Sequence, residues 1–148
     1  MEKVMLKFER LLKKIISGQY FAVLNSVGDG QPYSNLITFA ITSDLKSLVF
    51  ITERDTRKYR NIVENSRVSI LIDSRTNQPS DITNAKAITV IGTAREVTEN
   101  KDALQALFLD KHPGLKEFVF APGNALILVT IQEYIIAGFK KTQRVTVG

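Results

Sequence analysis

The N-terminal segment repeats apolar residues at the spacing of an α-helix. Over residues 2–17 the apolar positions fall on one face, the basic positions fall mostly opposite, and Gly18 follows as a stop signal. The apolar positions are Val4, Met5, Phe8, Leu11, Leu12, Ile15 and Ile16. The pattern predicts a helix that packs against the body of the protein or a neighbouring subunit, with a membrane-surface helix as the alternative.

Short apolar runs rich in β-branched and aromatic residues dominate the rest of the chain. Turn residues separate them, as is typical of strands joined by hairpins. The predicted strands cover residues 20–26, 33–42, 47–52, 67–73, 87–97, 125–131 and 134–139. Helices are expected over 56–64 and 100–111, with a polar loop over 74–86. Few helices separate the strands, so the pattern predicts a mainly β antiparallel barrel with peripheral helices, as one domain over residues 1–148.

The residue inventory excludes several kinds of chemistry. The 148 residues contain no cysteine and one histidine, so disulfides, thiolate sites and metal centres are not expected. That histidine, His112, ends a predicted helix, where a histidine commonly interacts with the helix dipole. No apolar run approaches the roughly 20 residues that cross a bilayer. The start of the chain does not resemble a signal peptide, so a cytoplasmic protein with no membrane partner is expected.

The chain is basic, with a formal net charge of +5. A basic protein can bind nucleic acid, a membrane surface or a phosphorylated small molecule. The aromatic residues of the strands lie in apolar runs without interleaved basic residues, which argues against a barrel that binds single-stranded nucleic acid. The basic tail at 140–144 is expected to be a solvated charge run, with a second phosphate clamp over a partner's site as the alternative.

The segment 52–61 has the features of an anion-binding turn. A strand ends there, a polar turn follows, and a helix begins with Asp55 or Thr56 as its N-cap. Free backbone N–H groups and the positive end of the helix dipole attract phosphate at such a position. Arg57 and Lys58 lie in the first turn, where cations oppose the dipole unless an anion is bound. Surface ion pairs with neighbouring acidic residues are the alternative explanation.

Two segments resemble the pyridoxamine 5′-phosphate oxidase-like FMN-binding split-barrel family. Residues 48–73, LVFITERDTRKYRNIVENSRVSILID, are similar to its core, in which a strand ending in Thr precedes Ser/Thr-Arg-Lys and a short helix. Ser66 stands where the family has proline, and residues 30–39, GQPYSNLITF, resemble its Gly-x-Pro strand pair. The resemblance spans roughly residues 18–98. It implies a six- to seven-stranded antiparallel split barrel of Greek-key type, working as a homodimer with FMN at the subunit interface.

The same resemblance implies a set of cofactor-binding residues. By position, Arg57 and Lys58 match the family's phosphate-binding pair, and the strand from residue 35 matches the backbone that runs along the isoalloxazine ring. Arg75 and Asn77 lie in a loop that resembles flavin-approaching loops of other members. The full set is Asn35, Leu36, Ile37, Thr38, Ile51, Thr52, Thr56, Arg57, Lys58, Arg75 and Asn77.

Departures from the family pattern narrow the expected function. The true oxidase has a lysine where this chain has Ala40, and a flavin-contacting glutamine where it has Ala87. Residues 137–145 are basic but lack the oxidase's Arg/His-rich substrate motif. The expected function is therefore an FMN-dependent oxidoreductase acting on a small molecule other than pyridoxamine 5′-phosphate. A non-catalytic module that binds FMN or a deazaflavin is the alternative, and no catalytic residue is assigned.

Overall fold

The computed structural model describes residues 2–148, with the side chains of residues 2–5 outside the description. The helix α1 (Glu2–Ser17) has the predicted bounds. Its apolar stripe enters the main core, through Phe8, Leu12, Ile15 and Ile16. Val4 and Met5, which the sequence also assigns to this stripe, lie outside the described side chains. Along one face of α1, burial therefore follows the predicted helical period.

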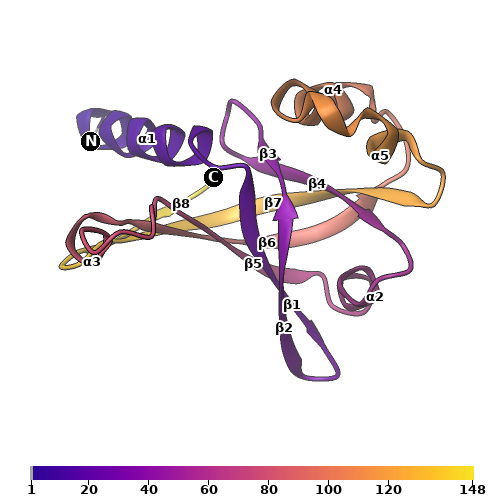
Figure 1. Ribbon diagram of the computed structural model, residues 1–148, viewed down its shortest axis with the longest axis horizontal. Helices are drawn as coiled ribbons and strands as arrows, with labels where there is room; N and C mark the ends of the chain where they lie inside the picture. Colours follow the sequence, from indigo (N-terminus) through magenta and orange to yellow (C-terminus); the bar gives the residue numbers. More distant parts are fainter. Residues whose placement is uncertain (1) are drawn as a thin grey trace.

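One antiparallel sheet forms the body of the molecule (Figure 1). Seven strands follow the order β2-β1-β5-β6-β7-β4-β3, and β8 pairs with β7. The strands are β1 (Phe21–Gly28), β2 (Gln31–Thr38), β3 (Ala40–Ile41), β4 (Ser47–Glu53), β5 (Arg67–Asp73), β6 (Ala87–Val97), β7 (Asn124–Ala137) and β8 (Thr142–Thr146). All seven pairings are antiparallel, which confirms the predicted split-barrel class.

The strand β4 is buried on both faces, and this divides the core into two layers. Leu48 and Phe50 point into the barrel interior, where they join side chains from the other strands and from α1. Val49 and Ile51 point the other way, into a second apolar cluster. Successive side chains of a strand face opposite sides, so a continuous apolar run is what a strand with two covered faces requires.

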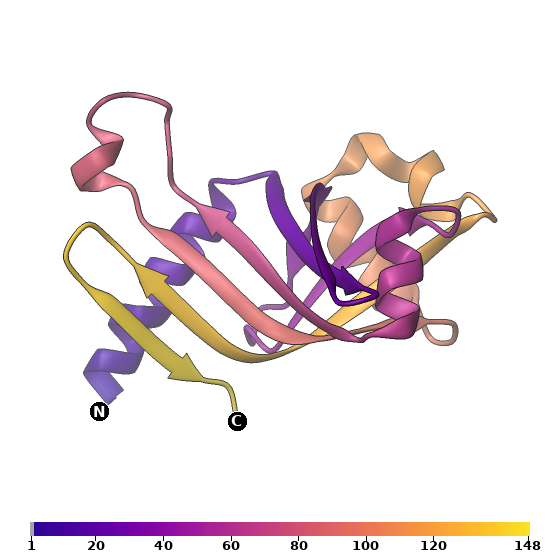
Figure 2. The same cartoon turned by 90° about the horizontal axis from the view of Figure 1, so that it is seen from below.

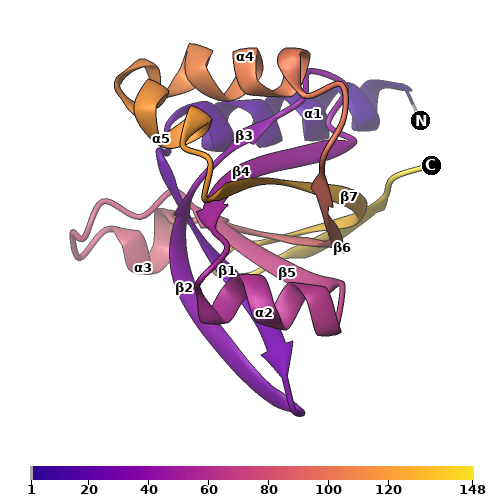
Figure 3. The same ribbon diagram turned by 90° about the vertical axis from the view of Figure 1, so that its right-hand side faces the viewer.

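Helices cover both ends and one side of the sheet (Figures 1 and 3). The remaining helical elements are α2 (Arg57–Glu64), α3 (Asp81–Asn84), α4 (Asp102–Lys111), the 3₁₀ turn η1 (Pro113–Leu115) and α5 (Lys116–Phe120). Phe108 of α4 and Val119 of α5 complete the second cluster against β4. Ile62 of α2 enters the main core instead. The helices predicted over 56–64 and 100–111 are confirmed as α2 and α4, and α3 is an addition within the predicted loop.

The C-terminal region differs most from the prediction. One bent strand, β7, replaces the two strands predicted over 125–139, because its pairing with β6 jumps from Ile91–Glu133 to Gly92–Ile131 and leaves Gln132 as an extra residue. At this bulge, an added Cβ on Gly92 would collide with the carbonyl oxygen of Thr130. The strand β8 then folds back on β7 (Figure 2). Lys140 and Lys141 lie in the loop before β8, and residues 140–144 are all exposed, as expected of a solvated charge run.

Candidate functional site

The turn between β4 and α2 is shaped by two threonine hydroxyls. Thr56 is the N-cap of α2, and its Oγ1 accepts the N–H of Tyr59 at 3.3 Å while donating to the carbonyl oxygen of Glu53 at 2.8 Å. The hydroxyl of Thr52 is buried and lies 3.3 Å from that of Thr56. Both hydroxyls therefore hold the turn in place, and the N–H groups at the start of α2 face outward.

An ionic network fixes the same turn to β6. The guanidinium of Arg54 contacts both carboxylate oxygens of Glu96, at 2.6 and 3.3 Å, and donates to the carbonyl oxygen of Pro122 at 3.0 Å. The hydroxyl of Tyr59 donates to Glu96 at 2.6 Å. The Arg54 guanidinium lowers the pKa of Glu96, and the hydrogen bond to Glu96 raises the pKa of Tyr59. The network anchors the turn from behind and neutralises Arg54.

Arg57 and Lys58 stand without an ion-paired carboxylate at the start of α2. Among the described side chains, those of residues 6–148, Asp55 of this turn pairs with Arg60 at 3.4 Å, and neither Arg57 nor Lys58 forms an ion pair. Burial lowers the pKa of Lys58, because desolvation disfavours its charged form. The surface ion pairs considered from the sequence thus leave Arg57 and Lys58 available to an anion.

The strand β2 lies beside this turn. The Arg57 guanidinium sits over the ring of Tyr33, 4.4 Å from its centroid, in a cation–π contact. Asn35 lies two residues further along the same face of β2, and its Oδ1 is buried without a hydrogen-bond partner among the described residues. A buried oxygen of this kind is costly and requires a hydrogen-bond donor, which a water, an ion or a bound group can supply. In the described sheet β2 pairs only with β1, so its other edge has free backbone groups.

Only some of the predicted site residues lie together in space. The turn between β4 and α2 and the β2 residues lie together through the contact of Arg57 with Tyr33. Side chains in β2 alternate, so Leu36 is 65% exposed on the outer face while Ile37 is buried in the core. The side chain of Ile51 points into the second apolar cluster, away from that turn.

Arg75 and Asn77 lie apart from these residues. Their loop and α3 occupy the opposite end of the molecule from α2 (Figures 1 and 2). Arg75 pairs with Asp73 at 3.0 Å, and Asn77, at φ +62°, donates its N–H to the carboxylate of Asp81 at 2.7 Å. Within one chain, therefore, the predicted loop residues do not join the predicted phosphate residues.

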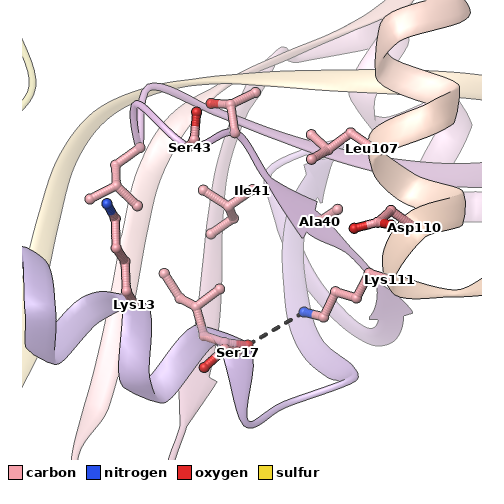
Figure 4. A pocket seen from close by; sticks show the side chains of 11 residues that line it. Lys13, Ser17, Ala40, Ile41, Ser43, Leu107, Asp110 and Lys111 are labelled. Carbon is pink, nitrogen blue, oxygen red and sulfur yellow. Dashed lines mark hydrogen bonds between the residues drawn. The ribbon is translucent and has the colours of Figure 1, made fainter.

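Sequence reasoning missed a cavity of about 490 Å³ between α1, β3 and α4 (Figure 4). Lys111 reaches into it from the end of α4. The neighbouring His112 caps that helix, is buried, and has its Nε2 2.7 Å from the carbonyl oxygen of Phe39. The only signal in the sequence was the helix end before Pro113, which does not tell which strand the helix covers.

A sequence model of a known family and several solved structures match this chain. The sequence model of the family described as pyridoxamine 5′-phosphate oxidase matches residues 8–134. No curated protein matches the chain.

Several solved structures share the fold at low sequence identity. The General Stress Protein 26 from Bacillus anthracis str. Sterne is 22% identical, with a TM-score of 0.70 over 93% of this chain and 98% of that chain. A heme binding protein from Mycobacterium smegmatis is 16% identical, with a TM-score of 0.82 over 93% of this chain, which spans 57% of that one. A FAD-binding protein from Mesorhizobium loti is 21% identical, with a TM-score of 0.66 over 86% and 90% of the two chains. At these identities the likeness is one of fold.

Proposed function

The chain belongs to the pyridoxamine 5′-phosphate oxidase family, and we propose that it is an FMN-dependent oxidoreductase acting on a small molecule. The juxtaposition of two features carries the proposal. Arg57 and Lys58 open the first turn of α2 without an ion pair among the described side chains, although the charge of Glu53 acts on Lys58, and beside them runs a strand whose Asn35 has an unsatisfied buried oxygen. A ligand with a phosphate at one end and a hydrogen-bonding heterocycle at the other would match these two features.

The turn suits the phosphate end of FMN. Arg57 offers a planar fork of donors and Lys58 a point charge, and both stand where the α2 dipole favours an anion. The Arg54–Glu96 network holds the turn rigid, so little order has to be created on binding. The chain's own contribution here is to bind and orient the cofactor.

The β2 edge suits the ring end of FMN. Free N–H and C=O groups along the edge can pair with the polar rim of a flavin, and Oδ1 of Asn35 can accept a hydrogen bond from it. A bound flavin supplies hydride or electron transfer between a reduced donor and a small acceptor. The chain's residues would then set the ring's position and exclude water from one of its faces.

A homodimer is the proposed assembly. On the outer face of the sheet, Val23 pairs across to Leu36 on one side and to Leu71 on the other, which makes an apolar row over three strands. Leu36 at 65% exposure is unusually accessible for such a row, as an interface residue would be. A second copy could also bring Arg75 and Asn77 to the flavin, which one chain does not do.

The substrate is proposed to differ from that of the true oxidase. Ala40 is buried against α4 in the second cluster, so this position offers no cation to a substrate phosphate. Ala87 pairs with Asp73 at the start of β6 and cannot donate to a flavin through its side chain. Haem, which the Mycobacterium smegmatis protein binds by its name, is disfavoured by the chain's one histidine, whose Nε2 is already bonded in the core.

The visible absorption spectrum of the purified protein, followed by titrations with FMN and riboflavin, tests the proposal. We expect flavin bands and a preference for FMN. Arg57→Met should reduce that preference by about tenfold or more, whereas Arg60→Met, one turn further along α2, should not change it. Colourless protein that binds neither flavin, or a Soret band with tight haem binding, would contradict the proposal. Oxidation of a reduced nicotinamide by the FMN-loaded protein distinguishes an oxidoreductase from a binding or deazaflavin module.

A further inference from the structure

The cavity between α1, β3 and α4 is lined by apolar walls with polar groups at its rim. Ile16 of α1, Ile41 of β3 and Leu107 of α4 provide the walls, and the volume of about 490 Å³ exceeds that of a buried water site. Lys13, Ser17 and Ser43 lie around the opening (Figure 4). Apolar walls with a few placed polar groups are the usual composition of a small-molecule site.

Lys111 is a half-buried cation in the lining of this cavity. Its Nζ donates to the carbonyl oxygen of Ile16 at 3.4 Å and lies 3.7 Å from the centroid of the Phe39 ring. Burial lowers its pKa to about 8, because the site desolvates the ammonium. The carbonyl and the ring use only part of the ammonium's three donors, and the half-buried side chain leaves the others open to water or to a ligand in the cavity.

The charges that line the cavity favour an anion. Lys13 from α1 and Lys111 from α4 contribute two cations, Asp110 from α4 contributes one carboxylate, and the β3 residues of the lining are uncharged. Asp110 and Lys111 form no ion pair among the described side chains, those of residues 6–148. A small ligand with a negative head and an apolar body would pair its head with Lys111 and place its body against the walls.

We propose that this cavity binds a small organic carboxylate with an apolar body, whose carboxylate pairs with Lys111. The inference does not require the flavin, since the cavity is complete within one chain. A bound carboxylate would also give a partner to the half-buried ammonium of Lys111, which takes no part in the proposed flavin site at the β4–α2 turn and the β2 edge. Ala40 lines the cavity, and Phe39 alone separates it from Thr38, the last residue of β2. An occupant of the cavity would therefore lie next to the end of the strand proposed to hold the flavin.

Isothermal titration of octanoate into the flavin-free protein tests the proposal, with 1-octanol as the uncharged probe of the same body. We expect octanoate to bind at least about tenfold more tightly than octanol, the difference that a charge-assisted hydrogen bond contributes. Lys111→Met, which keeps a long apolar stem over Phe39, should abolish that difference. Lys86→Met, an exposed lysine outside this cavity, should bind octanoate as the parent does.

Two further measurements guard against a variant that fails to fold. Asp110→Asn removes the opposing carboxylate from an exposed position and should strengthen octanoate binding several-fold. In the parent, affinity should fall as the pH rises above about 8, where Lys111 loses its proton. No binding by the parent at millimolar octanoate, equal affinity for octanol, or undiminished binding by a folded Lys111→Met would each overturn the proposal. Binding that weakens in Asp110→Asn would overturn it as well.

Discussion

Thr56 determines the conformation of the turn between β4 and α2. Its backbone is extended, at φ −137° and ψ 155°, and its Oγ1 bonds both Tyr59 N–H and the Glu53 carbonyl. Thr56→Ala removes both bonds, and loss of an N-cap side chain costs about 0.5–2 kcal/mol. The capping bond is long, at 3.3 Å, so we expect a loss near the lower end of that range. Thr56→Ser keeps the hydroxyl and should stay within about 0.5 kcal/mol of the parent.

Thr56→Asp separates the stability of α2 from its affinity for an anion. Aspartate caps a helix as well as threonine does, and its charge at the N-terminus adds about 0.3–1 kcal/mol of stability. The same carboxylate would lie beside the proposed phosphate position, next to Arg57 and Lys58. Repulsion between two anions at the edge of a protein amounts to about 1–2 kcal/mol, or roughly tenfold in affinity. A carboxylate cannot replace the hydrogen bond that Oγ1 of Thr56 donates to the Glu53 carbonyl, so the variant should lie between Thr56→Ala and the parent in stability. It should bind FMN more weakly than either of them.

Urea unfolding of the flavin-free protein measures the first effect, and quenching of flavin fluorescence measures the second. Riboflavin, which has no phosphate, serves as the internal control and should bind Thr56→Asp and the parent alike. The reasoning is refuted if Thr56→Asp binds FMN as tightly as the parent does. It is also refuted if the affinities for FMN and riboflavin fall together, since that would indicate general damage to the site.

Three other predictions concern the fold, the assembly and pH. Gly92→Ala should lower the free energy of unfolding by about 1–3 kcal/mol, because its Cβ would meet the carbonyl of Thr130; an unchanged urea midpoint would show that the bulge adapts. Leu36→Asp should convert a dimer into a monomer in light scattering after gel filtration, and a parent that is already monomeric would remove the proposed interface. The pKa of Glu96 is lowered in the fold by Arg54, so its stabilisation is present above the carboxyl group's ordinary pKa and is lost as the pH falls through the folded-state value. Glu96→Gln should make the melting temperature depend less on pH below about pH 5, and a parallel pH profile for the two proteins would show that another carboxyl group dominates.

Local patterns in the sequence determined most of the secondary structure. The helical stripe of α1 and the apolar runs of the strands specify their own periods, because burial on one face imposes a repeat of 3.6 or 2 residues. The same local chemistry indicated the cap of α2 at residues 55–56, since capping joins neighbours in the chain. It could not foresee that β7 continues through Gln132, because a bulge is set by the partner strand.

The tertiary structure alone decided how the site is assembled. Sequence analysis placed Arg57 and Lys58 at a helix start, but only folding brought Tyr33 and Asn35 beside them and left an oxygen of Asn35 without a partner. Likewise Glu96 neutralises Arg54 from a strand 42 residues away. Cross-strand pairing sets such contacts, and it depends on register over the whole sheet rather than on neighbouring residues.

The same reason explains the Lys111 cavity and the position of Arg75. In the sequence, Lys111 is one of many basic residues at the end of a helix, and its burial against Phe39 follows from where α4 packs on the sheet. Arg75 and Asn77 match a flavin-approaching loop by position. In the fold, however, their loop lies at the opposite end of the molecule from α2 (Figure 1). The sequence by itself determined the elements, the charges and the capped helix start that carries Arg57 and Lys58. The packing of distant elements decided which of those charges share a site, because burial and contact are properties of the assembled sheet.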